Sequence, residues 1–138
     1  MTNGVPTKGQ LLAGRILSGL VIAFLLFDAG LKLVAPQFAI DNSPPNLGWP
    51  AEIGTMYLLA VLLLVPTLLH IWPPTSILGA ILMTGYLGGA IATQVRVGNP
   101  LFSHMLFGVY LGLMMWGGLW LRDPRLRALI PLRTRTSA

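Results

Sequence analysis

FLLFDAGLKLV, residues 24–34, places an aspartate and a lysine four residues apart inside an otherwise apolar run. The full run, about residues 11–35, is long enough to cross a bilayer, whose ~30 Å hydrocarbon core needs ~20 helical residues. A charged side chain at membrane depth costs at least ~2.5–3.5 kcal/mol on insertion scales, so such residues are usually paired and face the protein interior. We therefore expect Asp28 and Lys32 to have partners within the protein.

The composition of the whole chain also indicates a membrane protein. Of the 138 residues, 54% are hydrophobic and only 9% are charged, whereas a soluble domain carries ~25% charged residues. The chain has no cysteine, which excludes disulfides and thiolate metal sites. Two histidines and four acidic residues leave little material for a metal site, and we predict none.

Three further apolar segments complete a predicted bundle of four membrane-spanning helices. Prolines mark most of the boundaries, because proline lacks a backbone N–H and is best accommodated at the start of a helix or just beyond its end. The expected spans are about residues 11–35, 51–71, 75–97 and 101–121. We therefore expect an all-α integral membrane four-helix bundle over residues 1–124 and a basic cytoplasmic tail over residues 125–138.

Lysine and arginine predict the orientation, because the cytoplasmic flanks of membrane helices are enriched in them. Seven lie beside the termini, namely Lys8, Arg15, Arg122, Arg125, Arg127, Arg133 and Arg135, and two lie at the opposite ends of the helices, namely Lys32 and Arg96. This bias predicts that both termini are cytoplasmic. Because the basic cluster follows an apolar helix, we expect it to contact an anionic membrane surface and not nucleic acid.

In this topology polar residues from all four predicted helices converge at the non-cytoplasmic end of the bundle. They are Asp28, Lys32, Glu52, Gln94, Arg96 and His104. One interpretation is an ion network between helices that neutralises itself, with Arg96 or His104 facing Asp28 across the bundle. The alternative is a ligand-binding pocket with apolar walls, suited to the headgroup of a quinone or a lipid. The residue types alone favour the network.

No catalytic constellation accompanies these six residues. His104 beside an acidic residue would be able to transfer protons, but no serine or cysteine nucleophile is placed with it. His70 lies at the opposite end of the bundle, so the two histidines cannot ligate one haem iron. We predict no catalytic residue, and the sequence favours a protein that is not an enzyme on its own.

Small residues recur at four-residue spacing, which lets membrane helices approach closely. The pairs are Gly19/Ala23, Gly85/Gly89 and Gly108/Gly112. We expect them to pack helices within the bundle; the alternative is a surface for self-association.

Four stretches of the chain resemble the DoxX-like family of small bacterial membrane proteins. They are RILSGL with DAGLKL (15–33), P-x-x-x-G-x-x-x-L (50–58), GYLGGAIATQVRVG (85–98) and WGGLWLRDPRLRALIP (116–131). The resemblance covers nearly the whole chain and implies a multi-pass four-helix bundle in the cell inner membrane. The founding relatives are named for a membrane subunit of a thiosulfate:quinone oxidoreductase. Many relatives have a histidine after Ala-Thr where this chain has Gln94, which puts proton or quinone chemistry at that position in doubt.

Three functions are compatible with these features. We expect first a small non-catalytic accessory or assembly subunit of a membrane complex such as an oxidoreductase, with no cofactor of its own. The second is a quinone-interacting redox subunit that uses the six polar residues, and the third is a small lipid binder or transporter. No inverted repeat or broken helix supports transport. The expected partners are the lipid bilayer and other membrane subunits or a second copy of the chain.

Reporter fusions test the predicted orientation. A reporter that is active only in the periplasm should be inactive when it is fused after Ala138, because the basic flanks keep both termini in the cytoplasm. The same reporter inserted after Asn99, in the turn between the third and fourth spans, should be active and serves as the control. Periplasmic activity after Ala138 would contradict the orientation.

Overall fold

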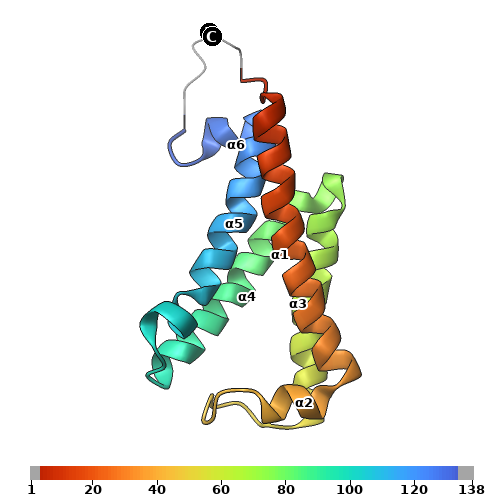
Figure 1. The fold of residues 1–138 in the computed structure, drawn as a ribbon, viewed down its shortest axis with the longest axis vertical. Coiled ribbons are helices and arrows are strands. Elements are labelled where there is room, and N and C mark those ends of the chain that lie inside the picture. The colour runs from red at the N-terminus through yellow and green to blue at the C-terminus, as the bar shows by residue number, and fades with distance from the viewer. Residues whose placement is uncertain (1–3, 134–138) are drawn as a thin grey trace.

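The computed structural model describes residues 4–133 and contains four long helices arranged as a bundle (Figure 1). The long helices are α1 (Lys8–Val34), α3 (Ile53–Ile71), α4 (Ser76–Arg96) and α5 (Phe107–Arg122). The short elements are α2 (Pro36–Asp41), the 3₁₀ turn η1 (Pro73–Thr75), the π-helical turn η2 (Leu101–Met105) and α6 (Pro124–Leu129). No strand occurs in these residues. The predicted all-α four-helix bundle is confirmed, and four helical stretches are long and apolar enough to cross a membrane.

The helix boundaries follow from local sequence signals. Thr7 and Gln10 form a reciprocal cap at the start of α1: the Thr7 hydroxyl accepts from the Gln10 backbone N–H at 3.2 Å, and the Gln10 side chain accepts from the Thr7 N–H at 2.9 Å. Pro36 and Pro124 are the first residues of α2 and α6, where the missing N–H costs nothing. Asp123 caps α6 by accepting from the Arg125 N–H at 2.9 Å.

Neighbouring helices in the bundle run antiparallel (Figure 1). Helix α1 packs against α3 and α5, and α4 packs against the same two helices, whereas the backbones of the diagonal pairs do not approach each other closely within the described residues. Residues 4–8 and 122–133 lie at one end of the bundle, here called the terminal end. Helix α2, the loop of residues 42–52 and η2 lie at the other, the loop end. The described chain thus begins and finishes at the same end.

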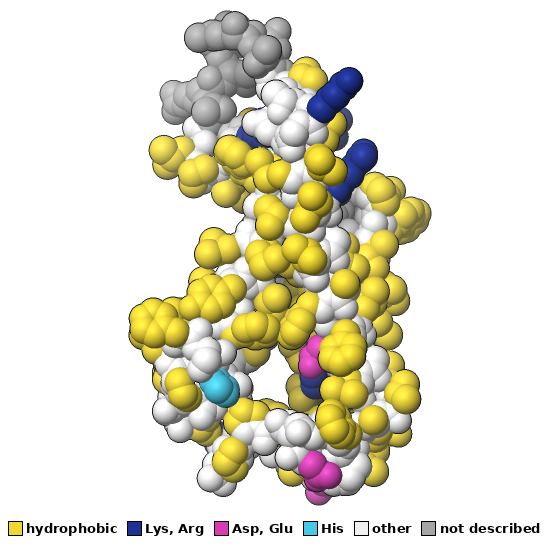
Figure 2. Space-filling view, in the orientation of Figure 1, with side chains coloured by type: hydrophobic (Ala, Val, Ile, Leu, Met, Phe, Trp, Pro, Cys, Tyr) yellow, Lys and Arg dark blue, Asp and Glu magenta, His cyan; other side chains and the backbone are white. Residues whose placement is uncertain are grey.

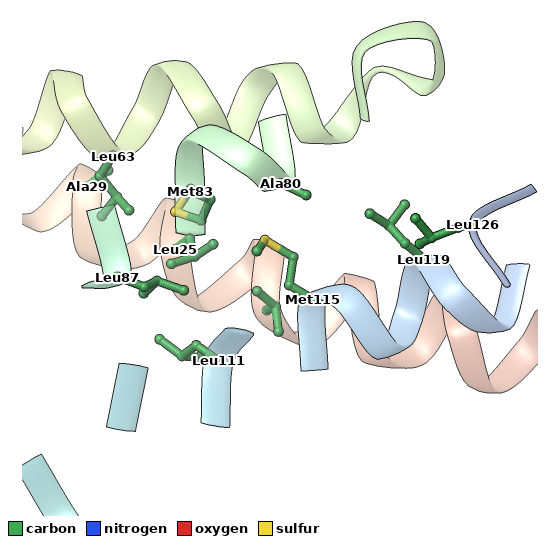
Figure 3. Packing of buried hydrophobic residues seen from close by; sticks show 11 residues of the cluster. Leu25, Ala29, Leu63, Ala80, Met83, Leu87, Leu111, Met115, Leu119 and Leu126 are labelled. Carbon is green, nitrogen blue, oxygen red and sulfur yellow. The ribbon is translucent and has the colours of Figure 1, made fainter. Parts of the chain in front are cut away.

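Apolar side chains fill the space between the four long helices (Figure 3). Met83 of α4 and Met115 of α5 are completely buried in this core, and their flexible thioether side chains suit the irregular gaps between crossing helices. Leu126 of α6 belongs to the same core and lies beside Leu119 (Figure 3). The first part of the expected tail is therefore packed on the bundle.

The rest of the expected tail, including Arg135, lies outside the described residues. The division into a bundle over residues 1–124 and a basic tail over residues 125–138 stays a prediction.

The helices approach most closely near the terminal end, where glycines lie at both main contacts. A Cβ built on Gly79 of α4 would overlap the backbone of α3, at 2.6 Å from the Pro66 carbonyl oxygen and 2.7 Å from the Cα of His70. A Cβ on Gly118 of α5 would lie 2.9 Å from the carbonyl oxygen of Gly14 in α1. The backbones of α3 with α4, and of α1 with α5, can therefore touch only because these positions lack side chains.

Polar groups join the same end of the bundle. The Arg122 guanidinium of α5 donates to the Ser18 hydroxyl of α1 at 2.9 Å. Between α3 and α4, the Ser76 hydroxyl donates to the His70 carbonyl at 2.8 Å, and His70 Nδ1 lies 2.9 Å from the Ser76 carbonyl oxygen. Because a carbonyl only accepts, His70 carries its proton on Nδ1.

The glycine pairs identified in the sequence mostly have another role. Gly108 does pack within the bundle, since a Cβ there would lie 2.8 Å from the Ile91 side chain. Gly19, Gly85 and Gly89 instead face open space. The expectation of internal packing is therefore wrong for two of the three pairs: Gly19 and Ala23 lie on the exposed face of α1, and Gly85 and Gly89 lie where the helices diverge toward the loop end.

Alanine substitutions in α4 test the close contact with α3. Gly79→Ala should lower the free energy of unfolding by ~1–3 kcal/mol, as overpacking does, because the new methyl group overlaps the α3 backbone. Gly88→Ala on the same helix is the matched control: nothing lies within 4 Å of its Cβ, and alanine favours a helix over glycine by ~0.5–1 kcal/mol. The measurement is unfolding in detergent. Equal stability of the two variants would contradict the close contact.

Candidate ligand-binding cavity

A cavity of about 630 Å³ lies at the loop end of the bundle. Residues of all four long helices line it, together with α2, η2 and the loop of residues 42–52. Figure 2 shows a hollow that opens on the drawn face, between the α1–α3 side and the α4–α5 side of the molecule. Its volume falls within the ~300–1,000 Å³ that is usual for small-molecule sites. The cavity exists because the helices that touch at the terminal end diverge here.

The walls of the cavity are mostly apolar. Leucine and aromatic side chains predominate, among them Phe24, Leu59, Leu62, Trp49, Phe107 and Leu111. Phe24 of α1 and Phe107 of α5 meet edge to face, with ring centroids 5.2 Å apart, a favourable arrangement of aromatic rings. This contact joins the two sides of the molecule where the cavity begins.

Asp28 and Lys32 line the cavity from α1 as an ion pair. The Lys32 ammonium donates to the Asp28 carboxylate one turn away, and the side chains are 16% and 34% exposed, respectively. This is the only ion pair in residues 4–133. Neither Arg96 nor His104, one of which we expected to face Asp28, forms a salt bridge with it within the described residues, although His104 lines the same cavity. Tyr86 of α4 lines the same cavity as Asp28.

Gln94 and His104 line the cavity from the α4–α5 side. The Gln94 carbonyl oxygen accepts from the Asn99 side chain, which closes the turn after α4. His104 lies on η2, and its Nδ1 is 2.7 Å from the Ser103 hydroxyl. In η2 the Leu106 N–H donates to the Leu101 carbonyl at 2.9 Å, five residues back, a pattern that occurs often at functional sites.

The other two predicted residues do not line the cavity. Glu52 is exposed at the start of α3, and its side chain makes no capping hydrogen bond. The guanidinium of Arg96 lies over Gly48, whose φ of +87° and lack of a side chain both permit the contact. Arg96 therefore holds the loop of residues 42–52 against the end of α4. Of the six predicted residues, the structure brings Asp28, Lys32, Gln94 and His104 to one cavity.

Sequence reasoning missed Tyr86 and the role of the glycines beside it. Gly85 and Gly89 both line the cavity, and open space lies beyond each of them, so missing side chains on this face of α4 contribute to its volume. The sequence GYLGG, residues 85–89, places an aromatic hydroxyl among glycines and thus contained a signal of the cavity. The same glycine spacing, however, equally suits helix packing.

The side chains that line the cavity suit the binding of a ligand better than the catalysis of a reaction. Lys32, Tyr86 and Gln94 supply hydrogen-bond donors beside a large apolar surface. No group of three or more side chains suited to hold a metal ion occurs between residues 4 and 133. The arrangement therefore suits a molecule with a polar head and an apolar body.

Leucine substitutions test the ion pair. Asp28→Leu or Lys32→Leu alone leaves a charge without its counter-ion beside an apolar cavity. Because the pair is partly buried, the loss of unfolding free energy should lie between the ~0.2–1 kcal/mol of exposed pairs and the ~3–5 kcal/mol of buried ones. The double variant should recover much of that loss, since an apolar pair can replace a buried ion pair. Melting in detergent measures both effects, and single variants as stable as the parent would show that the pair contributes nothing.

Comparison with known proteins agrees with this architecture. The model of the DoxX-like family matches residues 16–118, which include most of the four long helices and the residues that line the cavity. No curated protein and no solved structure matches the chain. The match covers well over half of the chain and, with four helices able to cross a bilayer, shows that this multi-pass membrane protein belongs to the DoxX-like family.

Proposed function

We propose that this protein is a non-catalytic subunit of an inner-membrane oxidoreductase complex and that its cavity binds a quinone-like molecule. The observation that carries the proposal is the cavity of about 630 Å³, which combines extensive apolar walls with a few polar groups from opposite sides. A quinone has the matching chemistry: a flat conjugated ring with two carbonyl acceptors and an apolar chain.

The polar groups suit recognition of ring carbonyls. Lys32 on α1, and Tyr86 and Gln94 on α4, can each donate a hydrogen bond, and they line the cavity from two helices that are diagonal to each other in the bundle. Donors on opposite walls suit the two carbonyls on opposite sides of a quinone ring. Apolar residues such as Leu59 and Leu62 of α3 supply the surface for the chain of the molecule.

The same residues argue against redox chemistry by the chain itself. Asp28 is neutralised by Lys32, and Gln94, which stands where many relatives have histidine, cannot transfer protons. His104 is exposed and bonds to its neighbour Ser103. We therefore favour binding without conversion.

A purely structural subunit is the second candidate. The local partners of Lys32 and His104, Asp28 and Ser103, favour it, because neither side chain requires a ligand to satisfy it. Large apolar side chains are exposed along all four long helices, and such surfaces suit both lipid and the helices of other subunits.

Filling the cavity separates the two candidates. The protein is purified in mild detergent, and its bound quinones and lipids are extracted and identified by mass spectrometry. Gly89→Phe places a ring where Gly89 now faces the cavity, so it should reduce the co-purifying quinone at least tenfold while the bundle stays folded. Gly88→Phe, on the neighbouring position outside the cavity, is the matched control and should retain the quinone.

Two results would contradict the proposal. Parent protein purified without any quinone would leave the structural candidate alone, as would Gly89→Phe with undiminished quinone. Proteins that co-purify with the parent identify the complex, and their retention by Gly89→Phe would show that assembly does not depend on the ligand.

A further inference from the structure

A second hollow lies at the terminal end, away from the cavity. It has a volume of about 400 Å³ and is lined by one face of α5, together with Leu126 of α6 and Ile130. The α5 residues are Leu113, Trp116, Gly117, Trp120 and Leu121, whose spacing of three and four places them along one stripe of the helix. We call this hollow the α5–α6 groove.

The groove has the length of an acyl chain within one leaflet. From Leu113 to Leu121 the stripe extends ~12 Å at 1.5 Å per residue. One leaflet contributes about half of the ~30 Å hydrocarbon core. A transmembrane helix of a partner would need a stripe of about the full ~30 Å, so the groove is short for a helix and suits one lipid chain.

Helix α6 closes the groove and brings positive charge to its rim. The Trp120 indole N–H donates to the Ile130 carbonyl at 3.0 Å, which folds the chain after α6 back onto α5. Arg127 donates to the Trp120 carbonyl at 2.7 Å, and its guanidinium carbon lies 5.1 Å from the centroid of the Trp120 ring, a cation–π arrangement. These contacts hold the Arg127 side chain against Trp120, whose ring lines the groove.

The charge at this end of the bundle is strongly positive. The described basic residues there are Lys8, Arg15, Arg122, Arg125, Arg127 and Arg133, and the described acidic residue is Asp123. At the loop end, by contrast, Lys32 and Arg96 are outnumbered by Asp28, Asp41 and Glu52. Figure 2 shows the same separation, with basic side chains at the terminal end and acidic ones toward the loop end. An anionic group is therefore favoured beside the α5–α6 groove.

We propose that the α5–α6 groove binds one acyl chain of an anionic phospholipid, with the lipid phosphate held by arginines of α6. Arg125 and Arg127 flank Leu126, which lines the groove, and Arg127 bonds to the carbonyls of Trp120 and Leu121, which also line it. Tryptophan at this depth is typical of the membrane interface, where headgroups lie. The site is separate from the cavity at the loop end and does not depend on the function proposed for it.

Tryptophan quenching tests the lipid site directly. In the Trp49→Phe/Trp72→Phe variant, Trp116 and Trp120 are the remaining two of the four tryptophans, and both line the groove. Phosphatidylglycerol with brominated acyl chains, added to this protein in neutral detergent, should quench them saturably. Phosphatidylcholine with the same chains should require a higher concentration. Unbrominated glycerol 3-phosphate should not relieve the quenching, because it lacks the chain that occupies the groove.

Charge variants at the two ends provide the matched comparison. Arg125→Gln should weaken the binding of phosphatidylglycerol about fivefold, the effect of one basic residue at an anionic surface, and should leave phosphatidylcholine unchanged. Arg96→Gln removes the same charge at the loop end and should change neither. Equal quenching by the two lipids, equal effects of the two variants, or relief of quenching by glycerol 3-phosphate would each overturn the proposal.

Discussion

The close approach of helix backbones at the terminal end is the constraint on which the rest of the structure depends. Gly79 lets α4 touch the backbone of α3, and Gly14 with Gly118 lets α1 touch α5. Lipid chains are as apolar as leucine, so helices in a membrane associate through packing and hydrogen bonds rather than through a hydrophobic effect between them. The hydrogen bond from Arg122 to Ser18, and those between His70 and Ser76, reinforce the same contacts.

The close backbone contacts at the terminal end leave the helices farther apart at the loop end. Helices that touch near the terminal end diverge toward the loop end (Figure 1), and side chains no longer fill the space between them. The structure limits this divergence with the Phe24–Phe107 contact and with the loop that Arg96 holds through Gly48. The result is a cavity that opens on the face drawn in Figure 2, and the same bundle thus has a packed end and a hollow end. The α5–α6 groove arises differently, because α6 folds back beside an apolar stripe of α5.

The ion pair that interrupts the first apolar segment shows which contacts can be predicted from residue types and which cannot. Asp28 and Lys32 do pair with each other, as four-residue spacing on a helix allows. The pairing removes the need for a charged partner across the bundle, so the network expected from six residues is absent within residues 4–133. Gln94 and His104 reach the cavity, whereas Arg96 turns to the loop and Glu52 to solvent. Which residues share an end of the bundle follows from topology, but which of them face one another depends on helix rotation and divergence.

The sequence by itself determined the membrane class, the four helices, the family and the end of the bundle at which the polar residues gather. These properties depend on composition, on the length of apolar runs and on proline positions, which are local features of the chain. Only the tertiary structure decided that Gly85 and Gly89 border a cavity instead of packing helices, that Tyr86 lines this cavity together with Asp28, and that α6 closes an apolar groove. The physical reason is that identical glycine spacings permit close contact or leave open space, according to the distance between the helix axes. That distance is set by contacts elsewhere in the bundle, between residues far apart in the sequence.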